Sequence, residues 1–279
     1  MERELYDRLE RALRVIPERR PPRAQYTDHD IARVVLWAAL HDRPVCWACD
    51  RSNWPGRRVI VPDASTVSRR SRRLGVLKLL RGLSPRGRGG DASLLCVDGK
   101  PLLVGRFSKD RQARFGHADG GMRRGYRLHA ACDRSGNIRA FCVRTLNDAE
   151  CVVARKLLSR AASRGSIVLG DAGYDANPLY EMAASRGARL IAPRRKAGRS
   201  ISEGHRQHAD RLRAIELLEG DARKRRQASR LRTAVERSFG WLTMLGGGSP
   251  PPWIRTLRRV RLWVLAKLAI HHAAIQARR

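Results

Sequence analysis

Leu94-Leu95-Cys96-Val97-Asp98-Gly99-Lys100 is the stretch that decides the fold class, because an apolar run stops there at a carboxylate. A second stretch, Ile167-Val168-Leu169-Gly170-Asp171, ends in the same way further along the chain. Both runs have the length and apolar character of buried strands. Ligand sites of α/β proteins lie at the carboxyl ends of such strands. We therefore expect Asp98 and Asp171 to face one another if their strands are neighbours.

Short apolar or alternating runs bounded by turn residues surround these two stretches and predict further strands. The strands expected in this part of the chain are residues 93–97, 101–104, 126–132, 138–143, 166–170 and 188–192. Helices are expected between the later strands, over residues 147–164 and 178–186, so that right-handed crossovers join those strands. This order predicts an α/β fold with a mixed sheet flanked by helices.

The first part of the chain has a different character and predicts an all-α domain over residues 1–85. Apolar residues recur at helical spacing over 2–15 and again over 28–40. Residues 65–74 then combine a polar helix start with four arginines, as the recognition helix of a helix-turn-helix does. Those arginines are Arg69, Arg70, Arg72 and Arg73. The same pattern also fits a solvated basic helix that ends a helical domain, and the sequence leaves both interpretations open.

A Gly/Arg/Pro-rich stretch over residues 82–90 predicts a linker, after which a second domain is expected over 91–279. Within that domain, residues 194–229 are strongly basic and weakly periodic, which predicts an exposed helical insertion. Residues 256–277 predict a C-terminal helix whose arginines and lysine are incompatible with a membrane span. Six cysteines are expected to be reduced thiols, and the Cys46/Cys49 pair lacks the second pair that zinc sites normally have.

The charge of the chain indicates a polyanionic partner. The 279 residues carry 58 Lys and Arg against 26 Asp and Glu, a formal net charge of +32. Nucleic acid is favoured over an anionic membrane, because the basic residues are spread along the chain and no apolar stretch reaches the roughly 20 residues of a spanning helix. The N-terminus lacks the features of a secretory signal, so the expected location is the cytoplasm.

A third carboxylate, Glu236, lies in an amphipathic helical segment where it shares a face with Arg232 at i,i+4 spacing. A helix packed on the sheet can bring this carboxylate to Asp98 and Asp171. Three convergent carboxylates form a hard oxygen site that suits magnesium or manganese. The alternative is structural: the two aspartates cap turns and Glu236 pairs with Arg232 or Arg237.

Five motifs in order resemble those of DDE transposases of bacterial insertion sequences. The first three carry the carboxylates: Val97-Asp98-Gly99-Lys100, Gly170-Asp171-Ala172-Gly173-Tyr174-Asp175 and Arg232-x-x-x-Glu236. Two more support the resemblance, Arg124-Gly125-Tyr126-Arg127-Leu128-His129 and Thr145-Leu146-Asn147-Asp148. The resemblance spans roughly residues 93–245. It implies a ribonuclease H-like mixed sheet of five strands.

The same resemblance implies how such a protein acts. Asp98, Asp171 and Glu236 would hold two Mg²⁺ or Mn²⁺ ions and cleave and rejoin DNA without a covalent enzyme intermediate. The implied partners are double-stranded DNA, as terminal inverted repeats and as target, and a second copy of the chain assembled on that DNA. Lys100, Arg232 and Arg237 are further expected DNA contacts.

One departure from the family pattern concerns DNA ends: the family often has a lysine seven residues after its glutamate, and this chain has Thr243 there. Two other functions stay open from the sequence. A ribonuclease H-like endonuclease or resolvase would cut DNA without joining it. A transposase-derived DNA-binding protein would keep the carboxylates without catalysis.

Overall fold

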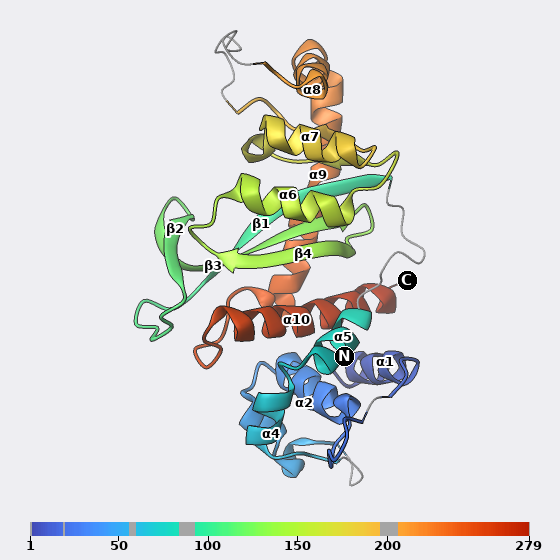
Figure 1. The fold of residues 1–279 in the computed structure, drawn as a ribbon, viewed down its shortest axis with the longest axis vertical. Helices are drawn as coiled ribbons and strands as arrows, with labels where there is room; N and C mark the ends of the chain where they lie inside the picture. Colours follow the sequence, from blue (N-terminus) through green and yellow to red (C-terminus); the bar gives the residue numbers. More distant parts are fainter. Residues whose placement is uncertain (1, 19, 56–59, 84–92, 196–205, 279) are drawn as a thin grey trace. The chain divides into compact units, whose positions relative to one another are not determined.

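The computed structural model describes residues 2–18, 20–55, 60–83, 93–195 and 206–278, and the chain divides into two compact units. Unit 1 comprises Met1–Arg86, Leu102–Arg114 and Trp241–Arg279, and unit 2 comprises Gly87–Pro101 and Phe115–Gly240. Figure 1 labels the helices and strands of both units.

Unit 2 is built around a mixed sheet. Its strands among the described residues are β1 (Leu94–Leu103), β2 (Arg114–Ala118), β3 (Gly121–Asp133), β4 (Ile138–Thr145), β5 (Ile167–Leu169) and β6 (Arg189–Ile191). The strand order is β2-β3-β1-β5-β6, with β4 paired to β3. The pairs β1/β5 and β5/β6 are parallel, whereas β3/β4 is antiparallel. The strand that carries Asp98 is therefore the direct neighbour of the strand that leads to Asp171.

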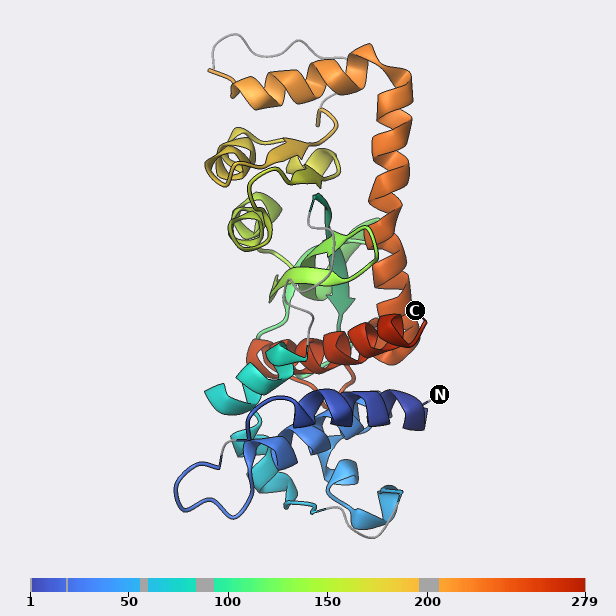
Figure 2. The same cartoon turned by 90° about the vertical axis from the view of Figure 1, so that its right-hand side faces the viewer.

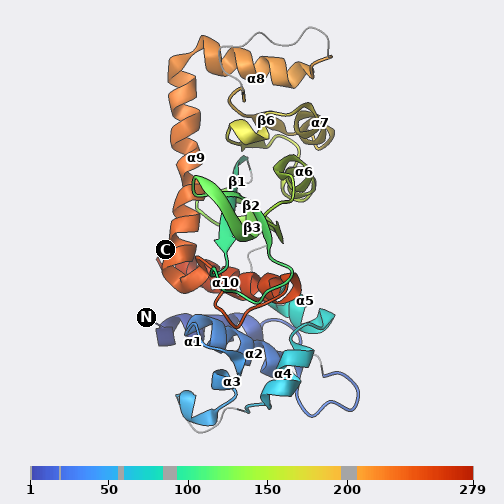
Figure 3. The ribbon, with the colours of Figure 1, turned by 90° about the vertical axis from the view of Figure 1, so that its left-hand side faces the viewer.

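Helices cover both faces of this sheet. They are α6 (Glu150–Ala161), α7 (Asn177–Ser185), α8 (Ala209–Gly220) and α9 (Ala222–Leu242). Figures 2 and 3 show α6 and α7 on one face and α9 along the opposite face. Buried apolar side chains of β1, β5, α6 and α7, including Leu95, Val168, Leu157 and Leu179, form one continuous core. Each fully buried side chain of this kind stabilises the fold by about 1.5–3 kcal/mol.

The predicted mixed sheet flanked by helices is confirmed, with two differences in its strands. Residues 93–97 and 101–104 were expected as separate strands, but both belong to β1. Only Leu94, Leu95 and Cys96 pair with β5, so Pro101, which has no N–H to donate, interrupts none of that ladder. The strand β2 was not predicted, because Arg-Phe-Gly-His-Ala lacks a run of β-branched residues. The sheet therefore has six described strands instead of five.

Unit 1 is helical. Its helices are α1 (Glu2–Arg14), α2 (Asp28–Leu40), α3 (Val45–Ala48), α4 (Ala64–Arg70), α5 (Leu74–Gly82) and α10 (Leu257–Ala277), with short segments η1 (Arg51–Asn53) and η3 (Thr243–Gly247). A capping box starts α2, since the Thr27 hydroxyl accepts from the Asp30 N–H while the Asp30 carboxylate accepts from the Thr27 N–H. The predicted helices over 2–15 and 28–40 are thus confirmed.

The C-terminal helix α10 belongs to unit 1. It packs against α1, α2 and α5, as Figure 1 shows. The physical reason is that α10 is buried from Val260 to Ala273 on most of its circumference, and such a helix needs apolar partners on several sides. Even Lys267 is buried there, with its ammonium group 2.6 Å from Asp42 Oδ1.

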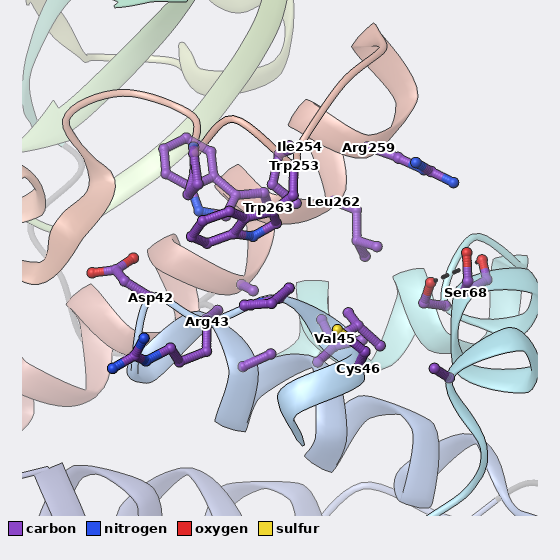
Figure 4. Close-up of a pocket in the computed structure, with 18 of the residues that line it drawn as sticks. Asp42, Arg43, Val45, Cys46, Ser68, Trp253, Ile254, Arg259, Leu262 and Trp263 are labelled. Carbon is purple, nitrogen blue, oxygen red and sulfur yellow. Dashed lines mark hydrogen bonds between the residues drawn. The ribbon is translucent and has the colours of Figure 1, made fainter. Parts of the chain in front are cut away.

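Unit 1 also has a cavity of about 270 Å³, drawn in Figure 4. Its walls come from α2, α3, α4, α10 and the segment before α10, and they include Trp253, Leu262 and Trp263. None of the predicted catalytic carboxylates lines it. Nearby, Cys46 is exposed and Cys49 is half-buried.

Two predicted segments lie partly outside the described residues: the linker over 82–90, of which 84–90 are not described, and the insertion over 194–229, of which 196–205 are not described. The later part of the insertion is helical, in α8 and α9, as predicted. Among the described residues, no helix is both long and apolar enough to cross a membrane.

Candidate active site

Asp98 lies within β1, and Asp171 lies two residues after the end of the neighbouring parallel strand β5. In the β1/β5 ladder, Cys96 pairs with Leu169, and each aspartate lies two residues beyond its member of that pair. On β1, the side chains of Cys96 and Asp98 point to the same side, because they are two residues apart. Asp98 Oδ1 accepts a hydrogen bond from its neighbouring Gly99 N–H at 2.7 Å, and Asp171 Oδ1 accepts from the Gly173 N–H at 2.8 Å. The expectation that the two strands are neighbours is confirmed, but Asp98 does not end its strand as predicted, because β1 continues to Leu103.

The environment of Asp98 disfavours its ionised form. Burial raises the pKa of Asp98 to about 6, and the negative charges of Asp171 and Glu150 act in the same direction. The Gly99 N–H and the Arg232 guanidinium oppose this rise. A bound cation would relieve the same repulsion, because it favours the ionised form of every carboxylate around it.

Glu236 reaches this region on the helix α9. Arg232 Nη2 lies 2.9 Å from Glu236 Oε1, and Arg232 Nη1 lies 3.6 Å from Asp98 Oδ2. One guanidinium therefore stands between the two carboxylates, and the predicted i,i+4 pair is formed. The helix is attached to the sheet by a hydrogen bond from Ser238 Oγ to the Gly136 carbonyl. Glu236 remains half-exposed, with 51% of its side chain accessible.

The donor chemistry fits a hard divalent cation, although the carboxylates do not close around one point. Within the described ranges, no group of three or more His, Cys, Asp or Glu side chains is arranged to hold a metal ion. The oxygen atoms of Asp98 and Asp171 are nevertheless the ligands that Mg²⁺ and Mn²⁺ prefer. A positively charged side chain, Arg232, already compensates Asp98 and Glu236. The donor atoms of Asp98 on β1 and of Asp171 after β5 are thus of the type that binds such a cation, while the described side chains are not gathered around one.

A second cavity of about 240 Å³ opens at the carboxyl end of β5. It is lined by Asp171, by Pro193 after β6, and by Arg225 and Arg232 of α9. In such a cavity, the carboxylate can bind a metal ion, and the two guanidinium groups can donate hydrogen bonds to a phosphate.

The four arginines predicted to bind DNA have different surroundings. Arg69 and Arg73 are exposed and Arg72 is half-buried. Arg70 is buried instead, with Nη2 2.8 Å from Asp28 Oδ1 and Nη1 donating to the Tyr26 carbonyl. The Arg70 guanidinium therefore binds acceptors inside unit 1, and its predicted DNA contact stays a prediction.

In unit 2, two further predicted DNA contacts are placed as follows. Arg237 is exposed on α9. Lys100 is half-buried on β1, and burial lowers the pKa of its ammonium group. Both side chains are more exposed than that of Arg70, of which only 8% is accessible.

The family model for the transposase DDE domain matches residues 89–271. This chain belongs to the DDE transposase family. The match includes Asp98, Asp171 and Glu236, and it confirms the predicted function of a DNA transposase and hence of an enzyme. Members of this family generally use divalent metal ions.

A solved structure supports the fold of the transposase. The chain is similar to the piggyBac transposase in a cryo-EM structure of its synaptic complex with hairpin DNA, with a TM-score of 0.50 and 11% sequence identity. The similarity covers 98% of this chain and 71% of that chain. At this identity, the similarity shows the fold alone. No curated protein matches the chain.

The sequence analysis missed one carboxylate of this region, Glu150. It is the first residue of α6, and its charge acts on Asp98 and on Tyr174. An acidic residue in the first helical turn is ordinarily explained by the helix dipole, so the sequence held no separate signal for it.

Proposed function

We propose that this transposase cleaves DNA at the ends of a mobile element and joins those ends to target DNA, at a metal centre held by Asp98, Asp171 and Glu236. The observation that carries the proposal is the register of the parallel strands β1 and β5: Asp98 and Asp171 each follow by two residues the paired Cys96 and Leu169. The raised pKa of Asp98, to about 6, supports it, because strongly perturbed carboxylates occur often at functional sites.

Two Mg²⁺ or Mn²⁺ ions, when bound, would activate a water molecule or a 3′-hydroxyl and stabilise the leaving oxygen of the phosphodiester. Asp98 and Asp171 would hold these ions from the sheet, and Glu236 would hold one of them from α9. For Glu236 to take that role, Arg232 must exchange its carboxylate partners for the DNA phosphate. No residue of the chain forms a covalent intermediate in this reaction.

The cavity beside Asp171 suggests where the phosphate lies. Arg225 and Arg232 line it and can form bidentate hydrogen bonds with phosphate oxygens. The exposed Arg237 and the half-buried Lys100 would contact the DNA backbone near the site.

Binding of the element ends is assigned to residues 1–85, through Arg69, Arg72 and Arg73. Their placement on and just after the short helix α4 is compatible with a recognition segment. We also propose that two copies of the chain assemble on DNA, so that both ends of an element are processed together.

The test is an assay of DNA that carries candidate element ends, incubated with the purified transposase and Mg²⁺. Cleavage followed by joining of the end to a target plasmid is the expected result. Cleavage without any joined product would favour an endonuclease or resolvase. Binding without cleavage in Mg²⁺ or Mn²⁺ would contradict the proposal and favour a non-catalytic DNA-binding protein.

A further inference from the structure

The cavity of unit 1 takes no part in the proposed metal chemistry, and its two long sides are apolar. Figure 4 shows Trp253, Trp263 and Leu262 along one side of it. Val45 and Cys46 of α3 lie along the other side. Small and aliphatic side chains of α2, α4 and α10 complete the lining of this space of about 270 Å³. An apolar group therefore fits between the two sides.

Trp253 differs from the tryptophans that stabilise unit 1. Trp47 and Trp54 both stack on Trp37. The indole N–H groups of Trp37 and Trp54 donate to backbone carbonyls. Trp253, in contrast, is 41% exposed, and within the described ranges its ring stacks on no other aromatic ring. An exposed indole at the edge of an apolar cavity offers a surface on which a nucleic-acid base can stack.

The same cavity is basic at its ends. Arg43, Arg72 and Arg259 belong to its lining, and Figure 4 shows Arg43 and Arg259 at opposite ends of it. Both of these are exposed, and neither forms an ion pair in the part of the chain that the structure describes. The acidic residue of the lining, Asp42, is already paired, because the ammonium group of Lys267 lies 2.6 Å from its Oδ1. The charge of the lining therefore favours an anionic occupant.

One wall of the cavity belongs to the segment that we propose to read the element ends. Ser68 and Arg72 line the cavity, whereas Arg69 and Arg73 of the same segment are exposed. Arg72 Nε donates to the Ser68 carbonyl at 2.8 Å, and this bond orients the Arg72 side chain. DNA that is bound through Arg69 and Arg73 would therefore pass close to the cavity.

A nucleotide fits this combination, because it joins a flat aromatic base, which can stack on an indole, to a phosphate, which arginine binds. A base inside an intact duplex is stacked on both faces, so only a base that has left the stack can enter a cavity. A second copy of the chain fits less well. Its net charge of +32 would bring more positive charge to the arginines of the cavity.

We propose that the cavity of unit 1 binds one unpaired base of the DNA, stacked on Trp253, while Arg43 and Arg259 contact the adjoining phosphates. The inference rests on the proposed function, because it assumes that unit 1 binds DNA. Bases leave the stack most easily where the strands are already separated, as they are beside a cut end.

The experiment compares three short duplexes of the same sequence. One is fully paired, one has a single extra unpaired base, and one has an abasic site in place of that base. Fluorescence anisotropy measures their affinity for the full chain without divalent metal, so that no cleavage occurs. The native chain should bind the duplex with the unpaired base about tenfold more tightly than the abasic duplex, since stacking on an aromatic side chain contributes this much per base. The abasic duplex has the same number of phosphates, so this difference isolates the base.

Trp253→Ala should abolish the tenfold difference and leave binding of the paired duplex unchanged, because it removes the stacking surface but no charge. Trp253→Phe keeps an aromatic ring and should retain most of the difference. Phe107→Ala is the matched control, since it removes a more exposed aromatic side chain of unit 1 that does not line the cavity. It should behave as the native chain does.

A measurement on the native chain locates the base without any substitution. Cys46 is exposed and lines the cavity. The duplex with the unpaired base should slow alkylation of Cys46 several-fold, as read by mass spectrometry, whereas the abasic duplex should not.

The inference is overturned if the native chain binds the base-containing and abasic duplexes equally well, or if Trp253→Ala keeps the difference. It is also overturned if both duplexes protect Cys46 equally, or if Trp253→Ala changes only the association of the chain with itself, which would make the cavity an interface between copies. In each of these cases, binding of the paired duplex leaves the proposed function intact. If the native chain binds none of the three duplexes, the proposed function itself is wrong.

Discussion

Replacing Asp98 by asparagine should stabilise the metal-free protein at neutral pH. The pKa of this carboxyl is raised to about 6 in the fold, against about 3.9 for an unperturbed aspartate. A folded-state pKa above the unfolded one means that the folded state binds the proton more tightly, so stability falls as the pH rises from about 4 to about 6. Above that range the ionised Asp98 costs about 3 kcal/mol, at 1.36 kcal/mol per pKa unit. Asparagine keeps the acceptor for the Gly99 N–H and removes this cost.

The assay is thermal unfolding of the metal-free chain at pH 7 and at pH 4. We expect Asp98→Asn to raise the melting temperature by roughly 5–10 °C at pH 7 and to have little effect at pH 4. Asp175→Asn is the control of opposite sign. Burial alone would raise the pKa of Asp175, but hydrogen bonds from Arg211 at 2.7 Å hold it below its usual range. This substitution should therefore destabilise the fold at pH 7.

A loss of stability in Asp98→Asn at pH 7 would refute the reasoning. It would show that the ionised carboxylate serves the fold as a turn cap, which is the structural alternative for this residue. A gain of stability together with a loss of metal binding is the result expected of a metal ligand whose ionised carboxylate is destabilised when no cation is bound.

Three further predictions concern the basic residues. Arg70→Ala should lower the free energy of unfolding, measured by urea titration, by about 3–5 kcal/mol, because it leaves Asp28 buried and unpaired. Arg69→Ala, at an exposed position, should change this free energy by less than about 0.5 kcal/mol. Equal losses in the two variants would contradict the buried ion pair. The triple variant of Arg69, Arg72 and Arg73 to alanine should reduce the preference for end-bearing over random DNA in competition binding, since base contacts contribute about 1–3 kcal/mol each; an unchanged preference would move the search to residues 206–230. Affinity for random DNA should fall by about 10³–10⁵ between 50 and 200 mM salt if roughly six to ten phosphates are contacted, and a flat dependence would contradict a phosphate-dominated interface.

The placement of the two aspartates could be predicted from the sequence because it follows from short-range rules. An apolar run that ends on a carboxylate is visible in residues 94–98 and 167–171, and the parallel pairing of two buried strands needs only a crossover helix between them. The structure has this pairing, with Cys96 opposite Leu169. The ion pair of Arg232 and Glu236 could also be predicted, because residues at i,i+4 spacing lie on the same face of a helix.

Features that depend on distant partners could not be predicted. Arg70 is one of four similar arginines in its segment, and only the position of Asp28 on another helix selects it for burial. The grouping of α10 with α1, α2 and α5 likewise depends on which apolar faces are free to pack. Glu150 begins a helix, as many glutamates do. The sequence around it does not indicate that its carboxylate lies next to Gly99 and Gly173, which have no side chains to fill that space.

The most direct test of the metal-dependent mechanism is the rate of DNA strand cleavage under single-turnover conditions in Mg²⁺ and in Mn²⁺. Asp98→Asn, Asp171→Asn and Glu236→Gln are compared with the native chain and with Glu219→Gln, which removes a glutamate from an ion pair outside the site. We predict that each of the three site variants loses cleavage while it still binds DNA, because a metal ligand charge is removed at nearly constant volume. Glu219→Gln should cleave at the native rate. Native-like cleavage by any of the three site variants would contradict the assignment of that carboxylate to the metal centre.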